Sequence, residues 1–188
     1  MSINSQSISI KNTVIWGIIL LFLSPLSMKA QEGYPTPPTK FERLFYIQRT
    51  GNTNTICYDA QFSAHKTLNT TQPANVYWIR YGDKGEIKPL SYIQRTFAYG
   101  LKWRLLKENN YEMNLVSYGK KKIKVVLNET GKPQALTDIN GKNAQLHHIF
   151  VKMVKGTSML SLTPSIEYVE IFGHDPQTGA SVYEKVIP

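Results

Sequence analysis

The chain has 188 residues, 41% of them hydrophobic and 19% charged, and a formal net charge of +9. Its single cysteine, Cys57, excludes an internal disulfide, so the fold must be held by its core alone. The positive charge favours anionic partners, although solubility alone could explain it. Nucleic acid is excluded as a partner, because the sequence has no aromatic-basic RNA-binding signature.

The first forty residues are expected to precede the folded domain. Residues 1–30 contain Lys11, an apolar run at 14–23 and small or polar residues up to Ala30, the pattern of a secretory signal peptide. The run is shorter than the roughly twenty residues of a membrane span, although an uncleaved anchor is an alternative. Cleavage after Ala30, or a few residues away, would lower the net charge to +7. Residues 31–40 contain three prolines, which predicts an extended tether.

A single domain is expected from residue 41 to residue 188. Residues 44–49 and 54–62 are predicted strands of a hairpin, joined by a turn at 50–53. Cys57 lies in the second strand and is interpreted as a small buried hydrophobe. The polar residues 63–73 predict a loop.

Residues 76–81 combine β-branched and aromatic side chains, which predicts a buried strand ending at the polar residues 82–85. A short helix is expected at 92–99. Ser91 and Gln94 have capping-box spacing, and Gly100 stands where a left-handed C-cap is expected.

The same stretch contains the first candidate binding residues. Arg80 lies in an otherwise apolar strand, where an unpaired guanidinium is costly. A structural ion pair or a stacked, edge-exposed arginine explains it, and a bound anion is the sharper alternative. The candidate ligand-binding residues are Tyr77, Trp78, Arg80, Tyr81, Arg95, Lys102 and Arg104.

Three alternating runs after the helix, at 102–107, 111–115 and 122–127, predict an antiparallel meander. Its polar face is expected to carry a dense set of cations. A solvated face that blocks aggregation explains them, and a platform for an anionic surface is the alternative. The cations are Lys102, Arg104, Lys107, Lys120, Lys121, Lys122 and Lys124.

Further strands are predicted at 134–139, 143–155, 166–172 and 180–187, with Asn140-Gly141 as a hairpin turn and a loop at 156–165. Strand alternation predicts that Leu146, His148 and Phe150 share one face and that His147 points to the other. His174 and the acids of the last hairpin have no metal-ligand spacing, so neither a metal nor a cofactor is predicted.

Three segments resemble a known family, in the order in which they occur. They are LFYIQRTGNTNTICYDA, YWIRYGDKGEIKPLSYIQRTFAYGL and SIEYVEIFGHDPQTG. They are similar to the bacterial exported domain-of-unknown-function 4833 family, over about residues 44–186. The resemblance implies an exported, uncharacterised domain and no activity.

These patterns together predict an all-β fold, an antiparallel sandwich or barrel of about nine or ten strands, with one short helix after the third strand. The leading functional hypothesis is a non-catalytic binding or interaction domain, periplasmic or extracellular. Its ligand is unknown, with an anionic envelope polymer or lipid surface as the candidate partner. A hydrolase acting on an envelope polymer and a structural part of an envelope assembly remain alternatives.

Overall fold

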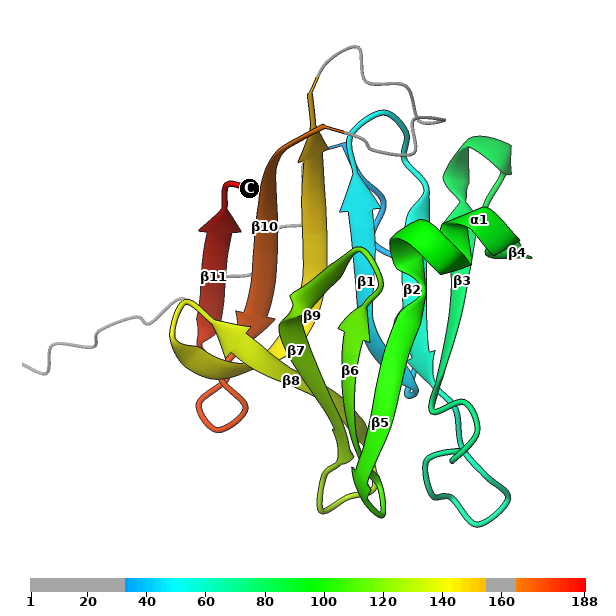
Figure 1. Ribbon diagram of the computed structural model, residues 1–188, viewed down its shortest axis with the longest axis vertical. Helices are drawn as coiled ribbons and strands as arrows, with labels where there is room; N and C mark the ends of the chain where they lie inside the picture. The colour runs from blue at the N-terminus through cyan, green and yellow to red at the C-terminus, as the bar shows by residue number, and fades with distance from the viewer. Residues whose placement is uncertain (1–32, 155–164) are drawn as a thin grey trace, which may run out of the picture.

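The computed structural model describes residues 33–154 and 165–188, so the predicted signal peptide and nearly all of the loop at 156–165 lie outside the described residues. The strands form one mixed sheet in the order β4-β3-β2-β1-β9-β8-β7-β6-β5, with β10 also paired to β9 and β11 to β10 (Figure 1). The strand bounds are β1 Arg43–Arg49, β2 Thr55–Ala60, β3 Ala74–Arg80, β4 Glu86–Pro89, β5 Leu101–Lys107, β6 Asn110–Leu115, β7 Tyr118–Leu127, β8 Pro133–Ile139, β9 Lys142–Met153, β10 Ile166–His174 and β11 Ser181–Val186.

The all-β prediction is confirmed, with two corrections. Within the described residues the sheet has eleven strands, because the exposed segment Glu86–Pro89 pairs with β3 as a short edge strand that the sequence pattern did not reveal. The short helix therefore follows the fourth strand. The sheet is also mixed and not purely antiparallel, because β1 and β9 run parallel.

The long strand β9 is the junction of the fold. On one edge its first residues pair with β8, and residues 148–151 pair with β1. On the other edge β10 follows it from Gln145 to Met153. Because β8 and β1 share one edge of β9, the β5–β8 meander diverges from the other strands and lies in front of them in Figure 1. The sheet thus curls over an inner face.

The main core lies on this inner face. It joins residues from both ends of the curled sheet, among them Phe45, Tyr58, Tyr111, Val125 and Ile149. Phe45 and Tyr58 stack with ring centroids 4.2 Å apart. A second, smaller cluster on the outer face consists of Tyr46, Cys57, Tyr77 and Ile79, with Tyr81 packed against it.

Cys57 is fully buried in the outer cluster, and burial raises the pKa of its thiol to about 12. Its predicted role as a small buried hydrophobe is confirmed.

The N-terminal segment 33–40 has no helix or strand and lies along the outer face. The Tyr34 ring meets Phe150 edge-on at 5.1 Å, and the Gln48 side chain donates to the Pro35 carbonyl over 2.7 Å. Pro37 is buried. The segment predicted as a tether therefore covers part of the sheet. Among the described residues, none of the helices has the length and apolar character needed to cross a membrane.

The predicted helix is present as α1 (Tyr92–Gln94) followed by a π-helical turn at Arg95–Tyr99. The capping box is confirmed, since Gln94 N donates to Ser91 Oγ and Ser91 N donates to Gln94 Oε1. The expected left-handed cap at Gly100 is wrong, because its φ is −64° and its ψ is 162°. Glycine is needed there for space, since a Cβ would lie 1.9 Å from the Arg95 carbonyl oxygen.

The expected alternation along β9 fails at the two histidines. The pairing with β10 shifts between Phe172 and Gly173, whose partners are His148 and Leu146, so His147 is the extra residue of a β-bulge. The bulge reverses the alternation and brings His147 Nδ1 within 2.8 Å of His148 Nδ1. The prediction that these rings point to opposite sides of the sheet is therefore wrong.

Candidate functional site

A cavity of about 550 Å³ lies within the curl of the sheet, between β6–β7 and β9–β11. Ligand pockets of folded proteins commonly have volumes of about 300–1,000 Å³. The lining is mostly aliphatic. Its residues are Ile47, Tyr99, Leu115, Ser117, Tyr118, Lys120, Lys121, Ile123, Thr137, Leu146, Ile149, Val151, Ile166, Val169, Ile171, Val186, Ile187 and Pro188.

The inner wall of the cavity comes from three neighbouring strands in register. Ile47 of β1 pairs with Ile149 of β9, which pairs in turn with Ile171 of β10. All three side chains are buried and line the cavity. The β-bulge at His147 is what places Leu146 on the same side as Ile149, because it shifts the alternation by one residue.

The polar part of the lining lies where the β6–β7 turn meets the end of the π-helical turn. Ser117 Oγ donates to the Ala98 carbonyl over 2.6 Å, and Val116 N donates to the Gly100 carbonyl over 2.9 Å. The Tyr58 hydroxyl donates to the Tyr99 carbonyl over 2.8 Å. These bonds fix the backbone on both sides of Tyr99, whose phenol pKa is raised by burial.

Lys120 and Lys121 are the charged residues of the lining. Lys121 donates to Glu184 of β11 over 2.5 Å, which ties the meander to the last strand. Lys120 is exposed and forms no ion pair within residues 33–154 and 165–188. No histidine, aspartate or glutamate lines this cavity among the described residues. The site offers a mostly apolar interior together with the lysine side chains of Lys120 and Lys121.

The predicted binding residues of β3 point to different sides of the sheet. Tyr77 belongs to the outer cluster, whereas Trp78 packs against the main core. Arg80 is paired with Asp83 at 2.5 Å and Glu86 at 3.6 Å, so its charge has structural partners. Tyr81 packs against the outer cluster.

Tyr77 and Arg95 meet at a more open hollow of about 360 Å³, which is also lined by Lys40 and Ile87. Lys40 is engaged by carboxylates, since its ammonium lies 3.7 Å from Asp59 and 3.9 Å from Glu42. This hollow does not include the other predicted binding residues.

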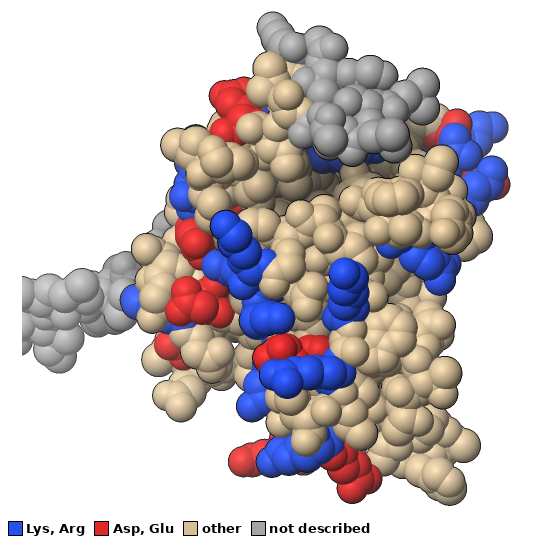
Figure 2. All heavy atoms as spheres, viewed as in Figure 1, with Lys and Arg blue, Asp and Glu red and all other residues tan. Residues whose placement is uncertain are grey.

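The cations predicted on the meander lie in two places, on its exposed face and at the cavity. Lys102, Arg104, Lys122 and Lys124 are exposed, and Figure 2 shows cationic side chains over this part of the molecule, with acidic ones among them. Glu112 accepts from Arg104 at 3.1 Å and lies 3.5 Å from Lys122; the Arg104 hydrogen bond is the main reason that its pKa is lowered. Lys107 is also exposed. Lys120 and Lys121 instead line the cavity.

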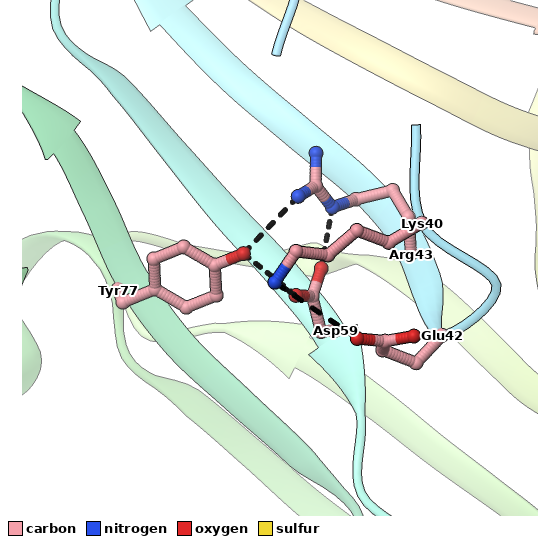
Figure 3. Close-up of polar contacts among 5 residues, drawn as sticks. All are labelled: Lys40, Glu42, Arg43, Asp59 and Tyr77. Carbon is pink, nitrogen blue, oxygen red and sulfur yellow. Dashed lines mark hydrogen bonds and ion pairs between the residues drawn. The ribbon is translucent and has the colours of Figure 1, made fainter. Parts of the chain in front are cut away.

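A polar cluster centred on Asp59 lies at the edge of the outer face (Figure 3). Arg43 Nε donates to Asp59, and the Tyr77 hydroxyl donates to the same carboxylate over 2.7 Å. The Tyr77 hydroxyl also accepts from Arg43 over 3.1 Å. Burial, followed by the bond to Asp59, raises the Tyr77 pKa. With every charge matched, the cluster acts as a structural link between β1, β2 and β3.

In the part of the chain that the structure describes, no hydrogen bond or ion pair joins a histidine to a carboxylate, although His174 lies next to Asp175 in the sequence. His148 is buried between Tyr46 and Phe172, at ring-centroid distances of 5.0 and 4.2 Å. Burial lowers its pKa to about 3, so the ring is neutral. His65 is exposed.

Asp175, one of the acids of the last hairpin, stabilises its turn. Asp175 Oδ1 accepts from Gln177 N and Thr178 N, and these bonds lower the Asp175 pKa. Across the described ranges, no group of three or more histidine, cysteine or acidic residues could hold a metal ion.

Sequence reasoning missed the cavity residues because their apolar side chains read as ordinary core positions. A model of the Domain of unknown function (DUF4833) matches residues 45–185. The chain belongs to the DUF4833 family. The resemblance to this family seen in the sequence is thereby confirmed. The matched range contains the cavity-lining residues from Ile47 to Ile171, whereas Val186, Ile187 and Pro188 lie just beyond it. Comparisons with curated proteins and with solved structures gave no match.

Proposed function

We propose that the DUF4833 domain of this chain is an exported, non-catalytic binding domain that holds an apolar ligand in the cavity between β6–β7 and β9–β11. The observation that carries the proposal is the cavity itself, about 550 Å³ with a mostly aliphatic wall. An apolar space of this size loses contacts while empty and gains them when an apolar ligand enters. Export is inferred from the pattern of residues 1–30.

The composition of the lining supports binding over hydrolysis. A hydrolase of the expected kind needs a histidine within hydrogen-bond reach of a carboxylate in a concave site. In the described part of the chain, the cavity offers aliphatic, hydroxyl and lysine side chains only.

The proposal is tested with linear alcohols, which carry no charge. Each methylene that enters the cavity should tighten binding about fourfold, because its transfer from water contributes about 0.8 kcal/mol. Calorimetry on 1-octanol, 1-nonanol and 1-decanol should show this gradient. Affinity that is absent, or that does not rise with chain length, would contradict the proposal.

A matched pair of valine variants locates the site. Val151→Trp places an indole in the cavity, whereas Val126→Trp changes another half-buried strand valine that does not line it. Val151→Trp should weaken 1-decanol binding about tenfold or more by filling the space that the ligand needs. Val126→Trp should bind as the wild type does. Equal losses in both variants would place the ligand elsewhere.

A further inference from the structure

Arg49, the last residue of β1, is a buried cation beside the polar part of the cavity. Its side chain follows Ile47 on the inner face by strand alternation, and only 9% of the residue is exposed. Its guanidinium carbon lies 5.8 Å from the centre of the Tyr99 ring. Tyr99 and Val151, the strand partner of Arg49, both line the cavity.

The charge of Arg49 is unmatched in the described part of the chain. Arg43, Arg80 and Arg104 each have a carboxylate partner. Arg49 forms no such pair among the described residues, and its Nε is buried without a hydrogen-bond acceptor. Burying a guanidinium costs free energy unless an anion or another acceptor binds its N–H groups. The face of the Tyr99 ring accepts none of these N–H groups as a hydrogen-bond partner.

Lys120 is a second available cation, and it belongs to the cavity lining. The bonds from Ser117 and Val116 to Ala98 and Gly100 hold the start of β7 against Tyr99, and Lys120 follows three residues after Ser117. Lys121 is already used by Glu184. The cavity therefore combines an aliphatic interior with Lys120 in its lining, and Arg49 lies next to the lining residues Tyr99 and Val151 without being part of the lining itself. Neither Arg49 nor Lys120 has a carboxylate partner among the described residues.

We propose that the ligand is a single-chain amphiphile with an anionic head group. Its hydrocarbon chain occupies the aliphatic interior lined by Ile149 and Ile171, and its head group binds Arg49 with help from Lys120. This inference rests on the proposed function and adds the chemical class of the ligand. Carboxylate and phosphate head groups share the required chemistry, because both accept charge-assisted hydrogen bonds from a guanidinium.

The test compares ligands of one chain length that differ in the head group. Calorimetry on purified protein at pH 7 would use 1-decanol, decanoate and decyl phosphate, each below the concentration at which it forms micelles. At least one anionic ligand should bind about tenfold or more tighter than 1-decanol, as expected for a charge-assisted bond in a desolvated site. The tighter of the two anions identifies the head group.

Two variants and a control test which residues cause the preference for an anionic head group. Arg49→Met keeps an unbranched apolar stem and removes the charge, so the preference should fall to about one while 1-decanol still binds. Lys120→Met should reduce the preference in part. Lys124→Met, which removes an exposed lysine that does not line the cavity, is the control and should change nothing.

The outcomes separate the two proposals. If 1-decanol binds and neither anion binds more tightly, the head-group inference is wrong and the apolar site stands. If none of the three ligands binds, the proposed function fails with it. If Arg49→Met does not fold, as circular dichroism would show, the wild-type comparison and Lys120→Met decide. A partial loss of the preference in Lys120→Met supports the head-group site, whereas a preference that is unchanged in Lys120→Met, or that falls equally in the Lys124→Met control, overturns it.

Discussion

Removing the carboxylate of Asp59 should destabilise the domain strongly. In Asp59→Ala, Arg43 loses its partner although its side chain is only 11% exposed, and the Tyr77 hydroxyl loses its acceptor at 2.7 Å. Breaking a buried pair from one side costs about 3–5 kcal/mol, because the remaining charge stays desolvated. Urea unfolding should show the loss as a lower midpoint. With an m-value of about 2 kcal/mol per molar, the shift is roughly 1.5–2.5 M.

Three further variants make this prediction specific. Tyr77→Phe removes one hydrogen bond and should cost about 1 kcal/mol. Glu42→Ala removes an acid 3.9 Å from the half-exposed Lys40 and should cost less than about 0.5 kcal/mol. Arg43→Met combined with Asp59→Leu removes both charges and should recover much of the loss. The reasoning is refuted if Asp59→Ala costs no more than Tyr77→Phe.

Two other predictions concern the helix end and the buried histidine. Gly100→Ala should lower the urea midpoint, because the new Cβ would lie 1.9 Å from the Arg95 carbonyl oxygen; a midpoint equal to that of the wild type would contradict this contact. His148 has its pKa lowered to about 3 by burial, so the unfolded chain binds more protons below pH 6.5 and stability falls as pH decreases toward 3. Between pH 7 and pH 4.5 this contributes about 2 kcal/mol, and His148→Phe should lose correspondingly less stability than the wild type over that range. A parallel pH dependence of the two proteins would show that His148 is not the group responsible.

The sequence was most informative where the signal is local. Hairpins follow from runs of β-branched residues separated by turn residues, and the meander from its alternation of lysines with apolar residues. The Ser91–Gln94 capping box depends on four consecutive residues, so it too could be predicted.

What escaped prediction depends on contacts between distant segments. The parallel pairing of β1 with β9 joins residues about a hundred positions apart, and no local pattern encodes it. The bulge at His147 arises from the pairing with β10, and it reverses the alternation on which the face assignments relied. β4 was missed because it is short, fully exposed and contains Glu86, Lys88 and Pro89, and only its edge position makes that composition suitable.

The candidate site shows the same limit. Arg80 attracted attention as a charge in an apolar strand, yet Asp83 and Glu86 pair with it nearby. Arg49 is the last residue of a predicted strand and was equally visible in the sequence. Its lack of a carboxylate partner among the described residues, and its position beside Tyr99, depend on the tertiary structure. The cavity lining is assembled from seven strands and the π-helical turn, and its aliphatic residues are typical of any core.

The central claim is that the cavity between β6–β7 and β9–β11 is a ligand site, and methyl NMR on isoleucine-labelled protein tests it most directly. During titration with 1-decanol, the methyl signals of Ile149 and Ile171, which line the cavity, should shift and saturate together. Ile79 of the outer cluster and the exposed Ile87 of β4 should not move. Shifts confined to Ile79 and Ile87, or no saturable shift at Ile149 and Ile171, would contradict the account.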